Sequence, residues 1–408
     1  MKSPTLLLKP SAYKSNKLYS VLPDNGDGDF SIYGSTSSRT RVDSRGVIKT
    51  ISSGVPRVDY FTGYGSAMFE PTRTNYVDES VDLSGWTLSH ASASFTFTAD
   101  SGIAPDGSMT AFLFDDKTAS TGTLTNYVTE SYSINDASNK QALSFFVKFD
   151  KTDKIAINIT SGGTSTISSA FVLSKDGSIT NPIATGIDSY SVDKYSDGWF
   201  RVKVIGTPSV SDTTILLEIG LVDIDSGGQI YTGSFFLWGI QLEEGPSVTS
   251  YIPTSGASVQ RVYDSLRVSN LSTNNIITFG HGSVLFDFEY NGEVPDADAV
   301  YQMSIGVTGG IIGIAAYTTG SLMRAVVDNS SDSTVNLSTG RNKVLFNIYD
   351  NSVEIWVNGV LEATNTITTA ALGDGVLSLN GSSAIFRLYE LSIFNQSLNS
   401  DECKKITQ

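Results

Sequence analysis

The residues with the best spacing for chemistry are two acidic side chains in the C-terminal part of the chain. Asp287 and Glu289 flank Phe288 in the alternating run 284–290, which ends at Tyr290. Successive side chains of a strand point to opposite faces, so the two carboxylates would share one face. Paired carboxylates suit glycoside hydrolysis, and a nearby aromatic ring can stack on a sugar. We take Asp287, Glu289 and Tyr290 as candidates for glycan contact. The alternatives are a solvated outer face for the acids and a core position for the tyrosine.

A second acidic pair, Glu243-Glu244, follows the apolar run 235–242 and precedes a Gly-Pro turn. Adjacent strand residues point to opposite faces, so these two carboxylates are not expected to converge on one substrate. We expect Trp238 to close a core, and the segment 251–253 to run extended along its flank. The stretch 238–264 is therefore predicted to be a boundary between two compact regions rather than an acidic site.

Metal and cofactor sites are not predicted. The two histidines, His90 and His281, are too few and too isolated for a zinc site. The turn cluster that begins at Asp24 resembles a calcium loop only superficially. Counted from Asp24, the third and twelfth loop positions are Gly26 and Ser35, where the EF-hand pattern needs oxygen ligands and a glutamate. We expect a solvated turn there.

A local group of basic residues stands out in this acidic protein: Arg39, Arg41, Arg45 and Arg57. The surrounding segment is rich in proline and turn residues, which disfavour long helices. The arginines are interpreted either as the solvated surface of a loop-rich segment or as a docking patch for an acidic partner, including neighbouring copies of this chain. Residues 1–70 are thus predicted to be an anchor or docking segment.

Composition predicts an all-β protein. The chain has 408 residues, of which 40% are hydrophobic and 17% charged, and it is rich in Gly, Ser, Thr, Tyr and Phe but lacks long runs at helical spacing. A length of this kind corresponds to about two or three domains. The single cysteine, Cys403, excludes an intrachain disulfide and is expected to be a small apolar residue of a C-terminal helix.

Charge and hydropathy restrict partners and location. The net charge of −15 argues against binding to nucleic acid, because the chain has no excess of cations to pair with phosphates. No apolar run is long enough to insert into a membrane, and the run 6–8 is too short for a secretory signal. We expect synthesis in a cytoplasm.

Short alternating runs separated by glycine-rich turns predict two β-sandwich domains, at residues 71–264 and 265–408. The clearest local signal is Asn358-Gly359 between two strand-like runs, which predicts a hairpin. A last strand is expected over 386–394. Asn399 is expected to cap a short helix over 400–406, with Glu402 at its third position.

The N-terminal two thirds resemble known families in ordered pieces. Residues 83–86, 104–108, 143–148, 196–202 and 237–245 resemble carbohydrate-binding jelly-roll domains. The pieces 6–11, 17–23, 28–30, 40–42, 55–60, 70–75 and 250–254 resemble bacteriophage head-fibre and tail-fibre proteins. The resemblance implies a virion appendage protein, made in the host bacterial cytoplasm, that docks to capsid or tail proteins and assembles as a homotrimer.

The C-terminal region resembles the concanavalin-like and laminin-G-like sandwich, through the hairpin 353–359 and the stretch 393–402. Glycosidases of that fold carry an alternating Glu-x-Asp-x-Glu strand. Asp287, Glu289 and Glu293 depart from that order and spacing. We therefore expect a structural and adhesive virion protein without enzymatic activity, which binds host surface polysaccharide. The alternatives are a glycan depolymerase that uses the C-terminal sandwich, and a cellular carbohydrate-binding module.

Overall fold

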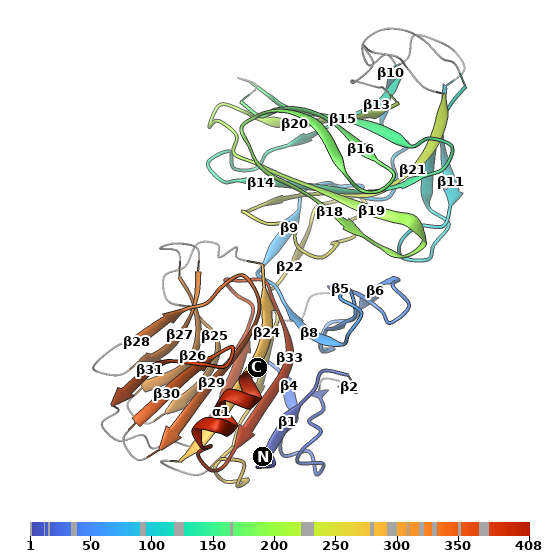
Figure 1. Ribbon diagram of the computed structural model, residues 1–408. Helices are drawn as coiled ribbons and strands as arrows, with labels where there is room; N and C mark the ends of the chain where they lie inside the picture. The colour runs from blue at the N-terminus through green and yellow to red at the C-terminus, as the bar shows by residue number, and fades with distance from the viewer. Residues whose placement is uncertain are drawn as a thin grey trace. The chain divides into compact units, whose positions relative to one another are not determined.

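The computed structural model describes two compact units. Unit 1 contains residues 1–44, 50–72 and 262–408, and unit 2 contains residues 45–49 and 73–261. The described residues are 2–11, 13–14, 17–33, 39–89, 95–117, 126–163, 166–221, 232–277, 281–291, 300–307, 310–317, 322–328, 333–349, 352–366 and 375–408. Glu293 and His90 lie outside these residues. The all-β prediction is confirmed (Figure 1).

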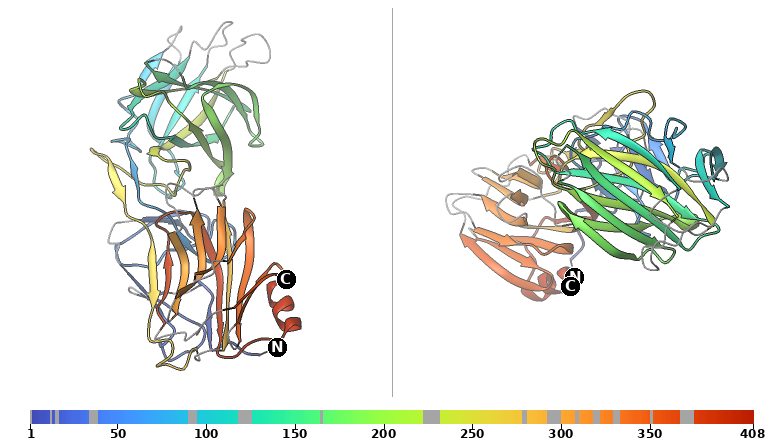
Figure 2. Two further views of the ribbon diagram at one scale, coloured as in Figure 1. Left: turned by 90° about the vertical axis from the view of Figure 1, so that its left-hand side faces the viewer. Right: turned by 90° about the horizontal axis from the view of Figure 1, so that it is seen from above.

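Unit 2 is a sandwich of two six-stranded sheets (Figures 1 and 2). The first sheet has the order β10 (Thr87–Ser89), β13 (Tyr127–Ser133), β20 (Thr214–Gly220), β15 (Lys154–Gly162), β16 (Ser168–Ser174), β17 (Ile179–Thr185). The second has the order β11 (Phe95–Gly102), β12 (Ala111–Asp116), β21 (Gly233–Glu244), β14 (Gln141–Phe149), β19 (Trp199–Gly206), β18 (Ile187–Lys194), and a 3₁₀ turn, η1 (Ser196–Gly198), precedes β19. The short strands β9 (Arg73–Asn75) and β22 (Val259–Arg261) pair with each other.

The alternating residues of unit 2 explain its core. On β15 the buried isoleucines 155, 157 and 159 point inward, and Ile157 lies opposite Ile219 of β20. Phe145 of β14 enters the same core from the second sheet. Trp238 is buried, but it lies on the opposite face of β21, where Tyr251 covers it at a ring distance of 4.6 Å.

Unit 1 is a second sandwich. One sheet has the order β31 (Val360–Thr366), β30 (Ser352–Val357), β29 (Gly340–Tyr349), β24 (Gly282–Tyr290), β33 (Phe386–Phe394), β8 (Ser66–Phe69), β7 (Val58–Asp59), and β1 (Leu6–Leu8) also pairs with β33. The other has the order β2 (Tyr13–Lys14), β3 (Lys17–Leu18), β4 (Phe30–Ile32), β23 (Ser265–Val268), β32 (Leu377–Asn380), β25 (Val300–Val307), β26 (Gly310–Tyr317), β27 (Leu322–Asp328), β28 (Ser333–Asn336). The remaining strands, β5 (Arg39–Val42) and β6 (Ile48–Ile51), pair with each other.

The N-terminal segment belongs to unit 1, which corrects the predicted division into 1–70, 71–264 and 265–408. Leu6 and Leu8 on β1 are fully buried, and Leu8 pairs with Leu391 of β33. Phe69 on β8 stacks on Phe386 at 4.6 Å. Burial of such side chains contributes roughly 1.5–3 kcal/mol each. The segment therefore supplies part of the core of unit 1 and is not a separate arm.

The C-terminal helix α1 (Ser400–Thr407) packs on the outer face of the first sheet of unit 1 through Cys403. Its predicted capping box is confirmed, because Asn399 and Glu402 each accept a main-chain N–H from the other. The main-chain N–H of Lys2 donates to Glu402 at 3.2 Å, so the chain ends lie close together (Figure 2). No helix of the described part of the chain is long and apolar enough to span a membrane.

Candidate functional site

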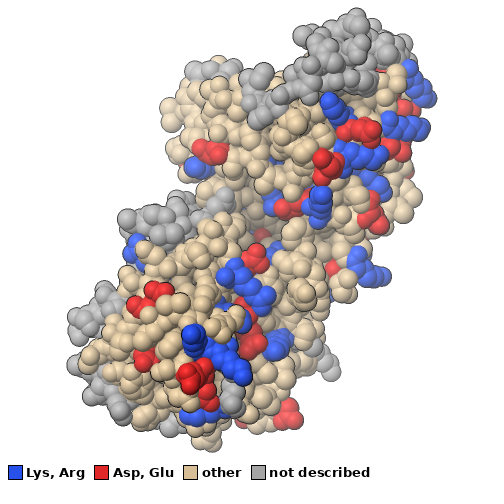
Figure 3. Space-filling model, viewed as in Figure 1, with Lys and Arg blue, Asp and Glu red and all other residues tan. Residues whose placement is uncertain are grey.

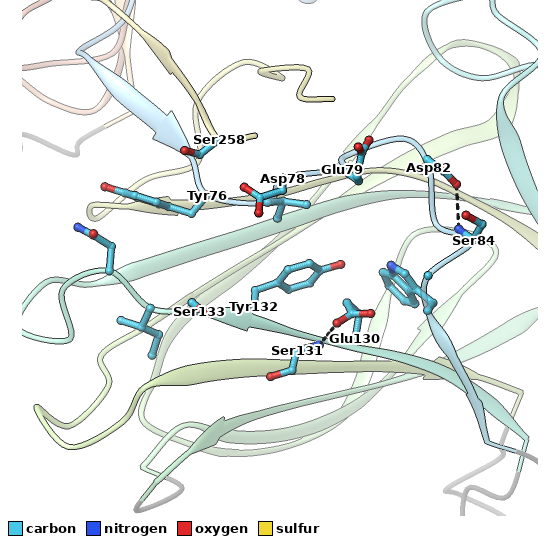
Figure 4. A pocket seen from close by; sticks show the side chains of 15 residues that line it. Tyr76, Asp78, Glu79, Asp82, Ser84, Glu130, Ser131, Tyr132, Ser133 and Ser258 are labelled. Atoms are coloured by element: carbon cyan, nitrogen blue, oxygen red, sulfur yellow. Dashed lines mark hydrogen bonds between the residues drawn. The ribbon is translucent and has the colours of Figure 1, made fainter. Parts of the chain in front are cut away.

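Unit 2 carries an open cleft of about 770 Å³, lined by the segment that follows β9 and by β13 (Figure 4). We call it the unit-2 cleft. Its described lining residues are Tyr76, Val77, Asp78, Glu79, Asp82, Ser84, Gly85, Trp86, Glu130, Ser131, Tyr132, Ser133, Ile134, Asn135 and Ser258. A volume of this order matches pockets that hold small organic ligands.

Aromatic side chains form one wall of the cleft. Trp86 meets Tyr132 edge to face, with ring centroids 6.5 Å apart, and lies tilted against Phe97 at 6.3 Å. A tight turn places Trp86, because its main-chain N–H donates to the carbonyl of Leu83, whose side chain is fully buried. Tyr76 is half-buried at the other end of the lining and keeps part of its ring accessible.

The hydroxyl of Tyr132 is the unusual polar group of the cleft. Only 8% of Tyr132 is exposed, and its hydroxyl makes no hydrogen bond of ordinary length and angle within the described part of the chain. Burial raises the pKa of Tyr132 well above its usual value, and nearby Glu130 adds to the rise. The indole N–H of Trp86 lies near enough to donate to this hydroxyl, which offsets part of the rise in pKa. A buried hydroxyl whose proton has no acceptor costs roughly 1–3 kcal/mol, which a ligand could recover.

Acidic side chains form another part of the cleft lining. Asp78, Glu79 and Asp82 are exposed, and Glu130 is half-buried. Glu130 and Tyr132 are two residues apart on β13, so they share the face that carries Val128 into the core. The side chain and main chain of Ser84 donate hydrogen bonds that lower the pKa of Asp82.

Hydrogen bonds fix the acidic edge of the cleft to unit 2. The Ser80 main-chain N–H donates to Thr254 Oγ1 at 3.0 Å, and the Ser80 hydroxyl contacts the Tyr251 hydroxyl at 2.6 Å. Asn75 Nδ2 donates to the carbonyl of Ile252 at 2.9 Å. The segment 75–80 is thus held between β21 and the stretch 251–254, which orders the cleft before any ligand binds.

The predicted glycan contacts of unit 1 have other partners in the structure. Tyr290 is buried, with 1% exposed, and its hydroxyl donates to the carbonyl of Leu337 at 2.6 Å, so its ring cannot stack on a sugar. Asp287 accepts two hydrogen bonds from Arg341, at 2.7 and 2.8 Å. Glu289 accepts from the Tyr389 hydroxyl at 2.6 Å. Asp287 and Glu289 do share the outer face, but the proposed contact of Tyr290 is wrong.

The predicted basic patch is divided by the fold. Arg39 and Arg57 are 3% exposed, and both bind Asp264 inside unit 1. Arg57 also pairs with Glu70 at 2.6 Å. Burial would lower the pKa of Arg57, but Asp264 and Glu70 raise it further than burial lowers it. These two arginines are structural, which corrects the prediction for them.

Arg41 and Arg45 differ from that buried pair. Arg41 is half-buried, donates to the carbonyl of Val58 at 2.8 Å and lies over the ring of Tyr13, whereas Arg45 is exposed. Figure 3 shows basic and acidic side chains interleaved on the visible face of each unit, with no large patch of one sign. A docking role for Arg41 and Arg45 stays a prediction.

Metal ligands do not cluster in the described ranges, where no group of three His, Cys, Asp or Glu side chains could hold an ion. In the predicted turn after Asp24, Asn25 Nδ2 donates to Asp27 at 2.7 Å and Ser20 donates to Asp29. Glu243 is also buried, and it accepts from the main-chain N–H of Thr249 at 2.9 Å. These carboxylates therefore accept hydrogen bonds that stabilise turns and loops.

Sequence reasoning missed the unit-2 cleft. The only local signal was Asp82-Leu83-Ser84, an acid followed by a hydroxyl two residues later, just before Trp86. The residues from β13 carry no motif that would join them to this turn.

Comparison with known proteins gives likeness of fold alone. No family model and no curated protein matches the chain. Among solved structures, a botulinum neurotoxin DC binding domain with a sialylated ligand is 14% identical, with a TM-score of 0.27, over 35% of this chain and 39% of that one. A tandem CBM22 domain of a Paenibacillus barcinonensis protein is 10% identical, with a TM-score of 0.24, over 78% and 96%. Trypanosoma rangeli sialidase bound to a difluorinated KDN is 8% identical, with a TM-score of 0.30, over 80% and 72%.

These solved structures include a neurotoxin binding domain and a tandem CBM22 domain, and none of the three is a virion protein. Because an enzyme, the sialidase, is among them, the prediction that this chain is not an enzyme does not stand. TM-scores of this size assign neither an activity nor a ligand to the chain.

Proposed function

We propose that this protein is an adhesin that binds glycans through the unit-2 cleft. The observation that carries the proposal is an ordered cleft in which the half-buried ring of Tyr76 stands beside carboxylates and hydroxyls. Sugars present apolar ring faces and many hydroxyls. Aromatic rings pack on the former, and carboxylates and hydroxyls bond the latter.

The proposal extends to the place of the protein on a particle. The ordered pieces 6–11, 55–60 and 250–254 support a role as a phage appendage protein. We propose that the chain is made in the host bacterial cytoplasm, joins capsid or tail proteins in the virion, and assembles with two further copies. Several weak glycan sites on one particle would then act together, which raises the apparent affinity.

Glycan binding is tested on the full chain with host surface polysaccharide and a Tyr76→Ala variant. Tyr76 lines the cleft and is half-buried, so its loss removes accessible aromatic surface at a smaller cost to the fold than loss of the buried Trp86. We expect affinity to fall about tenfold, the equivalent of roughly 1.4 kcal/mol. Isothermal titration measures the affinity, and circular dichroism checks the fold.

The matched control is Tyr64→Ala, because Tyr64 lies in unit 1 and is 73% exposed. Equal loss of affinity in both variants, or unchanged affinity in Tyr76→Ala, would remove the cleft from the proposal. The same incubations, followed for new reducing ends, test the glycan depolymerase alternative.

The virion role needs a separate test. Removal of residues 1–70 is unsuitable, because that segment supplies core strands of unit 1. Electron microscopy of particles labelled with an antibody to this chain gives its position, and sedimentation gives the number of copies per assembly. A chain absent from purified particles would contradict the virion role, whereas a monomer would contradict the trimer alone.

A further inference from the structure

The charges that line the unit-2 cleft are all of one sign. Asp78, Glu79, Asp82 and Glu130 contribute carboxylates, and the described lining holds no lysine, arginine or histidine. Three of these acids are exposed at the cleft, and the hydrogen bonds from Ser84 lower the pKa of Asp82 further below neutrality. A ligand that brought its own carboxylate would meet like charges without a compensating cation, which disfavours binding.

The charged hydrogen-bonding groups of the cleft are all acceptors. Ionised carboxylates only accept hydrogen bonds. Asp82 Oδ1 accepts from the main-chain N–H of Ser84 at 3.0 Å, and Glu130 Oε1 accepts from that of Ser131 at 3.0 Å. Asp78 and Glu79 stand on the segment that lies across from Tyr132 and Glu130 (Figure 4). A ligand rich in hydroxyl donors matches these groups.

A second and independent observation comes from the wall of the cleft. The Tyr132 hydroxyl is more than nine-tenths buried and belongs to a ring that lies between the 76–84 segment and Glu130 (Figure 4). The indole N–H of Trp86 lies near enough to donate to it, but no described residue accepts the hydroxyl proton in an ordinary hydrogen bond. Like any tyrosine hydroxyl it is protonated at neutral pH, and the raised pKa extends that state to higher pH, so the group is a hydrogen-bond donor. It needs an acceptor oxygen from the ligand.

We infer that the unit-2 cleft selects uncharged glycans, whose hydroxyls donate to Asp78, Glu79 and their acidic neighbours while one sugar oxygen accepts from Tyr132. Glycans that carry uronic or sialic acids are excluded by the carboxylates. This inference rests on the proposed function, because it names the class of glycan that the same site takes.

The experiment titrates the full chain with cellohexaose, maltohexaose, xylohexaose and hexagalacturonic acid at low salt. We expect at least one neutral oligosaccharide to bind and hexagalacturonic acid to bind at least tenfold more weakly. The Tyr132→Phe variant should lose about tenfold in affinity for the neutral oligosaccharide while its unfolding midpoint stays equal or rises, since it removes a buried hydroxyl whose proton has no acceptor. A purely structural hydroxyl would leave the affinity unchanged. Tyr190→Phe, at a partly buried tyrosine of β18, is the control.

The charge argument has its own variants. Replacement of Asp78 by Asn together with Glu79→Gln should raise the affinity for hexagalacturonic acid severalfold. Asp176→Asn is the control and should leave this affinity unchanged. Asp176 accepts from Ser178 as Asp82 accepts from Ser84, but it does not line the cleft.

Two results would overturn the inference in different ways. Preferred binding of hexagalacturonic acid that is lost in Tyr76→Ala would overturn the selection of neutral glycans and leave the proposed function intact. No binding of any neutral oligosaccharide, together with no binding of host polysaccharide, would overturn both.

Discussion

Cys403 illustrates how burial changes the chemistry of one side chain. It lies in α1 against the outer face of a sheet and is fully buried beside Leu398 and Trp356. Burial raises the pKa of its thiol to about 12, and Glu354 and Glu402 add to the rise. Only the thiolate reacts with disulfide reagents, so the folded protein should be inert to them over the physiological range.

We predict that Ellman's reagent at pH 8 releases no colour from the native chain and one equivalent after denaturation in urea. The native chain should not react because pH 8 lies far below the raised pKa, so the folded thiol stays protonated. A Cys403→Ser variant gives the background colour under both conditions. Rapid reaction of the native chain would show that α1 detaches from the sheet on the time scale of the assay.

Burial also separates the arginines of the N-terminal segment into two kinds. Arg45 is exposed, whereas Arg39 and Arg57 are enclosed with Asp264. Residue type and local spacing are alike in all of them, so only the fold distinguishes a surface cation from a structural one.

At the scale of elements, the buried ions join the places where the chain leaves and re-enters unit 1. Glu70 precedes the crossing into unit 2, and Asp264 follows the return. The main-chain N–H of Glu70 donates to Asp264 Oδ2 at 3.1 Å, while Arg39 and Arg57 bind the same carboxylate from β5 and the region before β7. Removal of one partner leaves the other charges buried without compensation.

We predict that Asp264→Asn lowers the free energy of unfolding of unit 1 by about 3–5 kcal/mol. Urea denaturation followed by circular dichroism measures it. The control Lys9→Gln breaks the pair between Lys9 and Glu390, in which Lys9 is more than half exposed, and it should leave the midpoint almost unchanged. Similar midpoints for the two variants would show that the buried cluster does not stabilise the unit.

Local signals let the sequence predict some elements well. Asn358 and Gly359 both adopt positive φ, at 48° and 86°, which is the conformation that the Asn-Gly pair favours in a hairpin. Asn399 and Glu402 lie three residues apart and form the predicted cap. Alternation likewise predicted the core strand that contains Phe286 and Phe288.

Long-range pairs were not predictable in the same way. Arg39 and Asp264 are 225 positions apart, and neither carries a local sign of its partner. Trp86 and Tyr132 form the wall of the cleft from separate elements, so no motif contains both. The N-terminal segment was interpreted as an arm because its strands are short and turn-rich. Only their pairing, such as Leu6 with Ile393, shows that they complete a sheet.

At the scale of the whole molecule, unit 2 is almost entirely an insertion into unit 1. Residues 73–261 leave and return at adjacent points, because the main-chain N–H of Tyr263 donates to Thr72 Oγ1 at 3.1 Å and that of Asp264 donates to the carbonyl of Glu70 at 3.1 Å. Each unit has its own hydrophobic core. Closure of so short a gap costs little chain entropy.

We predict that replacement of residues 73–261 by a Gly-Ser linker of about four residues leaves unit 1 folded. The short linker only has to span from Thr72 to Val262, whose neighbours are already hydrogen-bonded. Far-ultraviolet circular dichroism and a single cooperative urea transition measure the result. The residues 73–261 expressed alone should fold and keep the Tyr132-dependent glycan affinity.

The same excision in the Asp264→Asn background should unfold at a lower urea concentration, because the buried ions belong to unit 1. An unfolded product in the wild-type background would show that unit 1 depends on unit 2 for its stability.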